Sequence, residues 1–206
     1  RAFLQRAREE GRYVQAALTD ANTWITLEPE NGFACFHRAS INLAVGEKDA
    51  ALQDLTTGLQ KADPTGTKPN RRLAQAYIHR ALLLLERKQY EPAEKDLRRA
   101  QELDDEDPDL SYARSFLAER DGNAREALHL MERADFLYAQ RHKTSYLLEA
   151  PMVNNRYFKR LYKLREACGF DPMKRSERFA ESVEPVPAGG DDDDDDERLA
   201  QPLLPR

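Results

Sequence analysis

The stretch from Ala76 to Leu103 reads AYIHRALLLLERKQYEPAEKDLRRAQEL, and it decides the fold. It contains two apolar patterns of helical spacing, separated by a short polar break at residues 88–90 (KQY). Small alanines stand a few positions from large apolar residues, an arrangement that lets two antiparallel helices pack closely. One hairpin of this size cannot bury its apolar face alone. The first question is therefore whether the hairpin recurs along the chain.

The hairpin does recur, at a spacing close to 34 residues. Ala127 occupies the position of Ala93, and the polar break falls at residues 122–124 (GNA). In the other direction, residues 33–59 follow the same plan with a break at Gly46. The chain therefore contains a repeated unit of two helices.

An earlier copy and an insertion complete the pattern. Gly11 matches Gly46 at a spacing of 35 residues, which predicts that a first hairpin turns at Gly11. Ala51 and Ala93 are 42 residues apart, and the surplus of eight falls in the loop 63–70 (DPTGTKPN). We interpret this loop as a surface insertion, with a lip beside a binding groove as the alternative.

With three or four copies in nearly constant phase, the chain resembles the tetratricopeptide-repeat family from Arg1 to about Gln140. The resemblance implies an all-α, right-handed α-solenoid of about four helix–turn–helix repeats. We place the repeats at 1–30, 31–70, 71–107 and 108–142. Because the first repeat lacks its beginning, we expect the chain to start inside a longer protein or after a removed segment.

The repeat pattern stops before a different C-terminal region. Residues 151–169 (PMVNNRYFKRLYKLREACG) predict an amphipathic helix that caps the open end of the stack. Its outer face is expected to carry five basic residues: Arg156, Lys159, Arg160, Lys163 and Arg165. Residues 171–206 include six consecutive aspartates and predict an acidic, disordered tail. This tail holds 11 acidic and 5 basic residues, so the net charge of −5 belongs to it and residues 1–170 are nearly neutral.

Two Arg–Asp couples occur at the same phase of the repeat. Arg38 precedes Asp54 by 16 residues, and Arg80 precedes Asp96 by the same distance. The arginine falls on the first helix of its hairpin and the aspartate on the second, so we expect a two-point ion pair that bridges the helices. The fourth repeat has Leu130 at the aspartate position, and no such pair is expected there.

The resemblance also implies that the first helix of each hairpin lines a concave groove. By repeat phase, this groove is expected to be lined by Phe33, Phe36, His37, Ser40, Leu43, Gln75, Ile78, His79, Leu82, Leu85, Tyr112 and Phe116. Such an apolar and aromatic lining suits an apolar peptide or helix. Residues 81–85 (ALLLL) are apolar on every side, which a half-exposed helix does not need. We expect a partner, or the chain's own end, to pack against Ile78, Leu82 and Leu85.

The sequence shows no pattern typical of catalysis. The four histidines do not form a metal-type cluster, and no phosphate-binding glycine loop or nucleophile elbow is present. We therefore expect no enzyme activity, no cofactor and no metal. Cys35 and Cys168 are too far apart in sequence to indicate a disulfide framework, which favours a reducing intracellular compartment. No apolar run approaches the ~20 residues of a membrane span.

The favoured function is a non-catalytic scaffold or adaptor that binds another protein, within a larger assembly or alone. A basic clamp for acidic peptides, known from one subgroup of the family, is matched only by Arg1 and is disfavoured. One alternative is nucleic-acid binding by the basic and aromatic strip 156–165, which the acidic tail opposes. Another is a chaperone for histone-like basic partners that uses the aspartate run. A third is an adaptor region of a larger enzyme whose catalytic part precedes Arg1.

Overall fold

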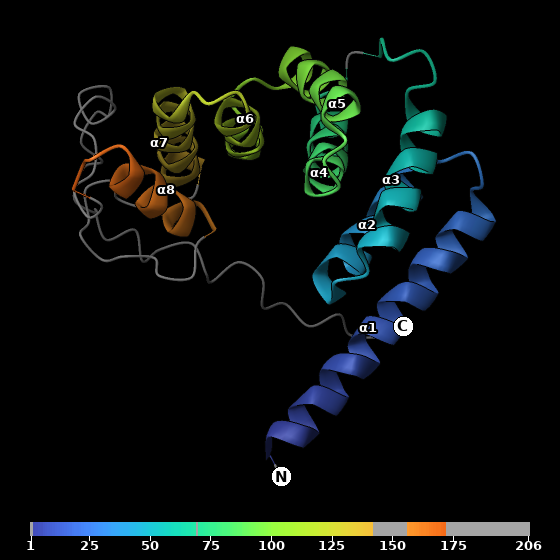
Figure 1. Cartoon of the computed structure of the whole chain (residues 1–206). Coiled ribbons are helices and arrows are strands. Elements are labelled where there is room, and N and C mark those ends of the chain that lie inside the picture. The colour runs from blue at the N-terminus through green and yellow to red at the C-terminus, as the bar shows by residue number, and fades with distance from the viewer. Residues whose placement is uncertain (1, 69, 142–155, 172–206) are drawn as a thin grey trace, which may run out of the picture.

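The computed structural model describes residues 2–68, 70–141 and 156–171. Within these ranges the chain is helical and contains no strand, which confirms the predicted all-α solenoid (Figure 1). The helices are α1 (Ala2–Leu27), α2 (Gly32–Val45), α3 (Lys48–Ala62), α4 (Arg72–Glu86), α5 (Tyr90–Leu103), α6 (Pro108–Arg120), α7 (Ala124–Arg141) and α8 (Arg156–Ala167). None of these described helices is long and apolar enough to cross a bilayer. The predicted tail lies outside the described residues from position 172 onward.

Three antiparallel helix pairs, α2/α3, α4/α5 and α6/α7, stack along the molecule (Figure 1). Each first helix is followed by one residue with a left-handed backbone: Gly46 (φ 86°), Lys88 (φ 59°) and Gly122 (φ 76°). A left-handed residue reverses the chain direction and closes the helix end, and glycine adopts this conformation without steric cost. These three positions fall in the three polar breaks of the sequence pattern.

The predicted turn at Gly11 is wrong, because α1 is one continuous helix of 26 residues. A glycine inside a helix costs only about 1 kcal/mol relative to alanine, and no proline within α1 interrupts the helix after Gly11. Among the α1 side chains from residue 11 onward, only Ala21 is completely buried, and Ala16 is exposed. The first predicted repeat is therefore a single long helix that packs against α2 through its C-terminal half (Figure 1).

Two glycines allow α2 and α3 to approach very closely. A Cβ atom built on Gly32 would lie 2.2 Å from the carbonyl oxygen of Gly58, and one built on Gly58 would lie 2.5 Å from the Phe36 ring. Real Cβ atoms do not occur at such distances, so both positions require glycine. The alanines Ala39 and Ala51 continue this close contact and are completely buried.

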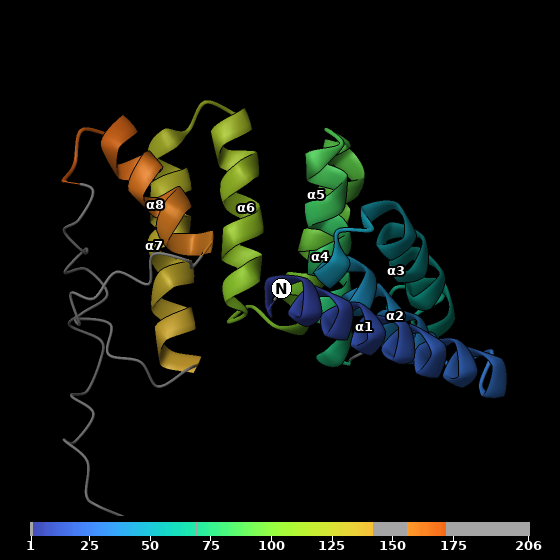
Figure 2. The same ribbon diagram turned by 90° about the horizontal axis from the view of Figure 1, so that it is seen from below.

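Two main clusters of buried apolar side chains in the described residues meet at α6, and a small third one lies around Phe136 of α7. The larger cluster joins α2 to α6 and includes Leu55, Ile78 and Leu97. The smaller cluster joins α6, α7 and α8 around Met131 and Leu161. Figure 2 shows α8 lying beside α6 and α7, so the described part of the predicted capping segment covers this end of the solenoid. Residues 151–155 of that segment lie outside the described residues.

The inserted loop between α3 and α4 is anchored at its first residue. The buried carboxylate of Asp63 accepts hydrogen bonds from the Tyr77 hydroxyl (3.0 Å) and from the backbone N–H of Lys68 (2.9 Å). Arg99 of α5 lies 3.5 Å from the same carboxylate and also donates to the Lys68 carbonyl. Burial and the neighbouring carboxylate raise the pKa of Tyr77 to about 12. The loop is therefore tied to α4 and α5.

Candidate binding cleft

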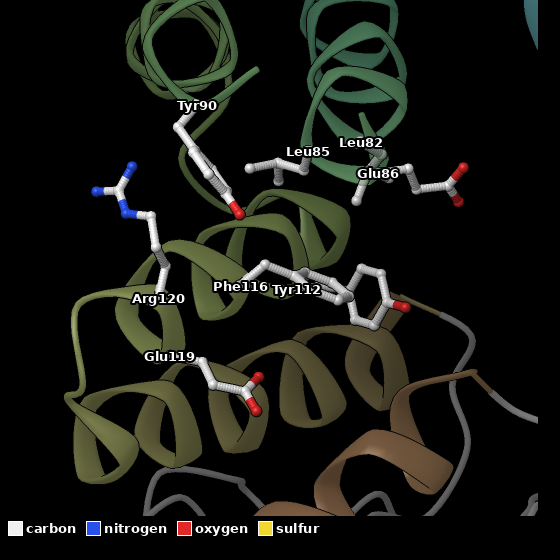
Figure 3. Close-up of a pocket in the computed structure, with 8 residues that line it drawn as sticks. All are labelled: Leu82, Leu85, Glu86, Tyr90, Tyr112, Phe116, Glu119 and Arg120. Carbon is white, nitrogen blue, oxygen red and sulfur yellow. The ribbon is translucent and has the colours of Figure 1, made fainter. Parts of the chain in front are cut away.

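The α4 and α6 walls face one another across a cleft of about 460 Å³ (Figure 3). Its lining residues are Leu82, Leu85 and Glu86 of α4, Tyr90 of α5, and Tyr112, Phe116, Glu119 and Arg120 of α6. This volume lies within the ~300–1,000 Å³ range of ligand pockets in proteins. The cleft offers an apolar and aromatic interior with charged groups around it.

Helical spacing explains how these side chains reach one cleft. On α6, Tyr112, Phe116 and Glu119 follow one another at intervals of four and three residues, so they share a face. The Tyr112 and Phe116 rings meet edge to face with centroids 5.2 Å apart. On α4, Leu82 and Glu86 are likewise four residues apart. The two walls belong to successive first helices of the repeat.

Ion pairs hold the charged groups of the cleft. The Glu86 carboxylate lies 2.6 Å from the Lys48 ammonium group, and Glu119 lies 2.6 Å from the Arg160 guanidinium group. Arg120 pairs with Asp121 at 2.7 Å. Its guanidinium carbon also lies 5.0 Å from the centre of the Tyr90 ring, in a cation–π contact. The side chains of both glutamates remain more than half exposed and accessible to a bound molecule.

The structure divides the predicted groove residues between the cleft, the core and the α1 contact. Leu82, Leu85, Tyr112 and Phe116 line the cleft. Ile78, in contrast, is completely buried in the larger core, so it offers no surface to a partner. Repeat phase placed Ile78 on the groove face, but neighbouring helices cover this position of α4.

The predicted residues on α2 do not join this cleft. Phe33, Phe36 and Leu43 are half-buried against the larger core, while His37 and Ser40 are exposed. The Trp24 ring of α1 lies 6.1 Å from the His37 ring, so α1 occupies part of the space in front of α2.

The two remaining predicted groove residues lie on α4, outside the cleft lining. The Gln75 amide donates to the Asp107 carboxylate, which caps α6. His79 is half-buried and makes contacts of its own.

Four cleft residues were not predicted from the sequence. Three of them lie one helical turn from predicted groove residues: Glu86, Glu119 and Arg120. Helical spacing from the predicted residues could therefore have identified these three positions. Tyr90 begins a second helix of the repeat, whereas the predicted groove residues were taken from the first helices only. It reaches the cleft because the turn at Lys88 brings the start of α5 beside the end of α4.

The structure brings together both Arg–Asp couples. Arg38 donates to Asp54 from Nε (3.0 Å) and Nη2 (2.5 Å), and Arg80 donates to Asp96 from Nε (2.7 Å) and Nη2 (2.6 Å). Each aspartate is buried. Burial raises the pKa of Asp96, an effect that the bonds from Arg80 oppose. Each couple links the two helices of its hairpin.

The predicted basic outer face of the last helix is corrected at Arg160 and Arg165, and the side chain of Arg156 lies outside the described part of the structure. Arg165 is only 3% exposed and pairs with the buried Glu132 of α7 at 2.8 Å. Arg160 is half-buried against α6, while Lys159 and Lys163 are exposed. The amphipathic pattern missed this arrangement because arginines facing a carboxylate on a neighbouring helix look the same as solvated arginines in sequence.

No protein-family model and no curated protein sequence matches the chain. Solved structures do match. A tetratricopeptide repeat protein from Parabacteroides merdae ATCC 43184 is 20% identical over 79% of this chain and 55% of that chain, with a TM-score of 0.53. The structure of MamA is 15% identical over 86% of this chain and 94% of that chain, with a TM-score of 0.55. This chain spans little more than half the length of the first structure. The likeness to both structures shows that the chain has the tetratricopeptide-repeat fold.

Proposed function

We propose that this solenoid is a non-catalytic scaffold that binds another protein by taking an apolar segment into the cleft between α4 and α6. The observation that carries the proposal is the lining itself, in which two leucines and three aromatic rings face one opening (Figure 3). Apolar side chains gathered at an open cleft are typical of interaction sites, where aromatic residues supply most of the binding energy.

The shape of the cleft supports a short anchor on the partner. A volume of about 460 Å³ accommodates one or two large apolar side chains, and a whole folded domain is excluded. Such anchors project from an amphipathic helix or an extended peptide. The half-exposed carboxylates of Glu86 and Glu119 favour polar or basic residues beside the anchor.

The described part of the basic strip supports nucleic-acid binding less well. Arg160 and Arg165 already face Glu119 and Glu132, at 2.6 and 2.8 Å. Phosphate contacts need cations that are available to the backbone of the nucleic acid. Two of the arginines that suggested this alternative are thus engaged within the protein.

The test is selection of peptides from a random phage-displayed library on the full chain, followed by titration of one synthetic peptide. Selected peptides should share an aromatic or branched aliphatic residue. Leu82→Ser should weaken binding of the chosen peptide about tenfold or more, because it removes one of the two leucines of the α4 wall. Leu27→Ser, an exposed leucine on α1, is the matched control and should leave the affinity unchanged. Selection of no peptide, or equal affinity for both variants, would contradict the proposal.

A further inference from the structure

We propose that α8 acts as the positioning element of the cleft, with Arg160 as the residue that holds the α6 wall in its binding geometry. The inference rests on the proposed function for its biological meaning, whereas its structural part stands by itself. Three of the cleft residues, Tyr112, Phe116 and Glu119, are contacted by α8.

Arg160 makes three contacts with α6 through one rigid group. Its guanidinium carbon lies 3.5 Å from the centre of the Phe116 ring. Its Nε donates to the Ser115 hydroxyl at 2.9 Å, and its Nη2 donates to Glu119 at 2.6 Å. A planar guanidinium group that stacks on a ring and donates hydrogen bonds from its edge fixes both the position and the tilt of that ring. The Phe116 ring is therefore held from the α8 side while it lines the cleft.

The contact continues from Ser115 to the next turn of α6. The Ser115 hydroxyl is completely buried and donates to the Tyr112 carbonyl at 2.7 Å. The Tyr112 ring meets the Tyr157 ring of α8 edge to face, with centroids 5.3 Å apart. Tyr157 in turn donates to the Asp109 carboxylate at the start of α6. Contacts from α8 thus follow α6 from its first turn to its last.

The remainder of α8 is attached elsewhere, which supplies a matched control. Arg165 pairs with Glu132 of α7, and neither residue lines the cleft. Replacement of this pair should leave the contacts between Arg160 and α6 in place. Replacing both partners by apolar residues, as in the double variant Arg165→Met with Glu132→Leu, avoids a buried unpaired charge.

The first test needs no ligand. 4-Fluorophenylalanine is placed at position 116 of the full chain, and its ¹⁹F spectrum is recorded. We expect one narrow resonance in the otherwise unchanged protein, a shifted and broadened or split resonance in Arg160→Ala, and an intermediate spectrum in Arg160→Lys, which keeps the charge but loses the planar group. The double variant should keep the narrow resonance. An unchanged spectrum in Arg160→Ala would overturn the proposal.

The second test uses the synthetic peptide selected on the full chain. Arg160→Ala should weaken it about tenfold, and the double variant should bind it as the parent does. If both variants bind it equally well, or equally poorly, the role of Arg160 is only structural and the inference is wrong. If the parent selects no peptide, the proposed function fails, and the ¹⁹F spectra still decide whether Arg160 positions Phe116.

Discussion

Arg80 and Asp96 hold the α4/α5 hairpin together where both side chains are largely withdrawn from water, at 20% and 7% exposure. Removing one partner leaves the other charge buried without compensation. Asp96→Ala should therefore lower the free energy of unfolding by about 3 kcal/mol, measured by urea denaturation.

The matched control is the exposed pair between Lys48 and Glu86. Its side chains are 55% and 54% exposed, so Lys48→Ala should cost less than about 1 kcal/mol. The double variant Arg80→Met with Asp96→Leu should recover much of the stability lost in Asp96→Ala, because neither charge then remains. Equal destabilisation by Asp96→Ala and Lys48→Ala would show that the buried pair contributes no more than the exposed one.

Tyr77 gives stability a dependence on alkaline pH. Its pKa rises from 10.0 to about 12 in the folded protein, so the folded chain keeps the phenol proton after the unfolded chain has lost it. This contribution is complete below pH 10 and is lost as the pH rises toward 12. The unfolding midpoint in urea should fall more steeply between about pH 10 and pH 12 in the parent than in Tyr77→Phe. Parallel pH profiles for the two proteins would contradict this assignment.

At the scale of the elements, glycines in similar sequence positions have opposite roles. Gly11 lies inside α1, where an added Cβ atom would meet no neighbour, so Gly11→Ala should stabilise the protein by about 0.5–1 kcal/mol. An added Cβ atom on Gly46 would also meet no neighbour, but the backbone of Gly46 is left-handed. Gly46→Ala should therefore destabilise the protein by about 1 kcal/mol. Thermal unfolding followed by circular dichroism measures both. Destabilisation by Gly11→Ala would contradict the continuous helix.

The turn at Lys88 supplies a complementary test. Lysine occupies a left-handed conformation there that favours glycine by about 1 kcal/mol. Lys88→Gly should raise the melting temperature slightly, in contrast to Gly46→Ala. A fall in the melting temperature would indicate that the lysine side chain makes a contribution larger than its backbone strain.

These elements also show what could be predicted from the sequence. The breaks at Gly46, Lys88 and Gly122 were found because each interrupts two apolar patterns that need one another for burial. The break at Gly11 was a false positive, because glycine permits a turn without requiring one. Contacts between helices distant in sequence, such as the one between Arg160 and Phe116, leave no periodic signal and could not be predicted.

At the scale of the whole molecule, the two core clusters predict uneven stability along the solenoid. Leu97 belongs to the larger cluster and Met131 to the smaller one, and both are buried. Either change to alanine should cost about 2–5 kcal/mol. Because repeat proteins depend on neighbouring units, Met131→Ala should accelerate amide hydrogen exchange mainly in α7 and α8, and Leu97→Ala mainly in α4 and α5. Equal acceleration throughout would show one cooperative unit instead.

The anchored loop between α3 and α4 has a practical consequence for labelling the protein. Its fixed points are Asp63 and Lys68, which are bonded to α4 and α5, whereas Thr65 is exposed and a side chain on Gly66 would meet no neighbour. A fluorophore attached to a cysteine in place of Thr65 would project from the surface and would leave the bonds of Asp63 and Lys68 in place. No residue of this loop lines the cleft, so binding could be measured with the label in place.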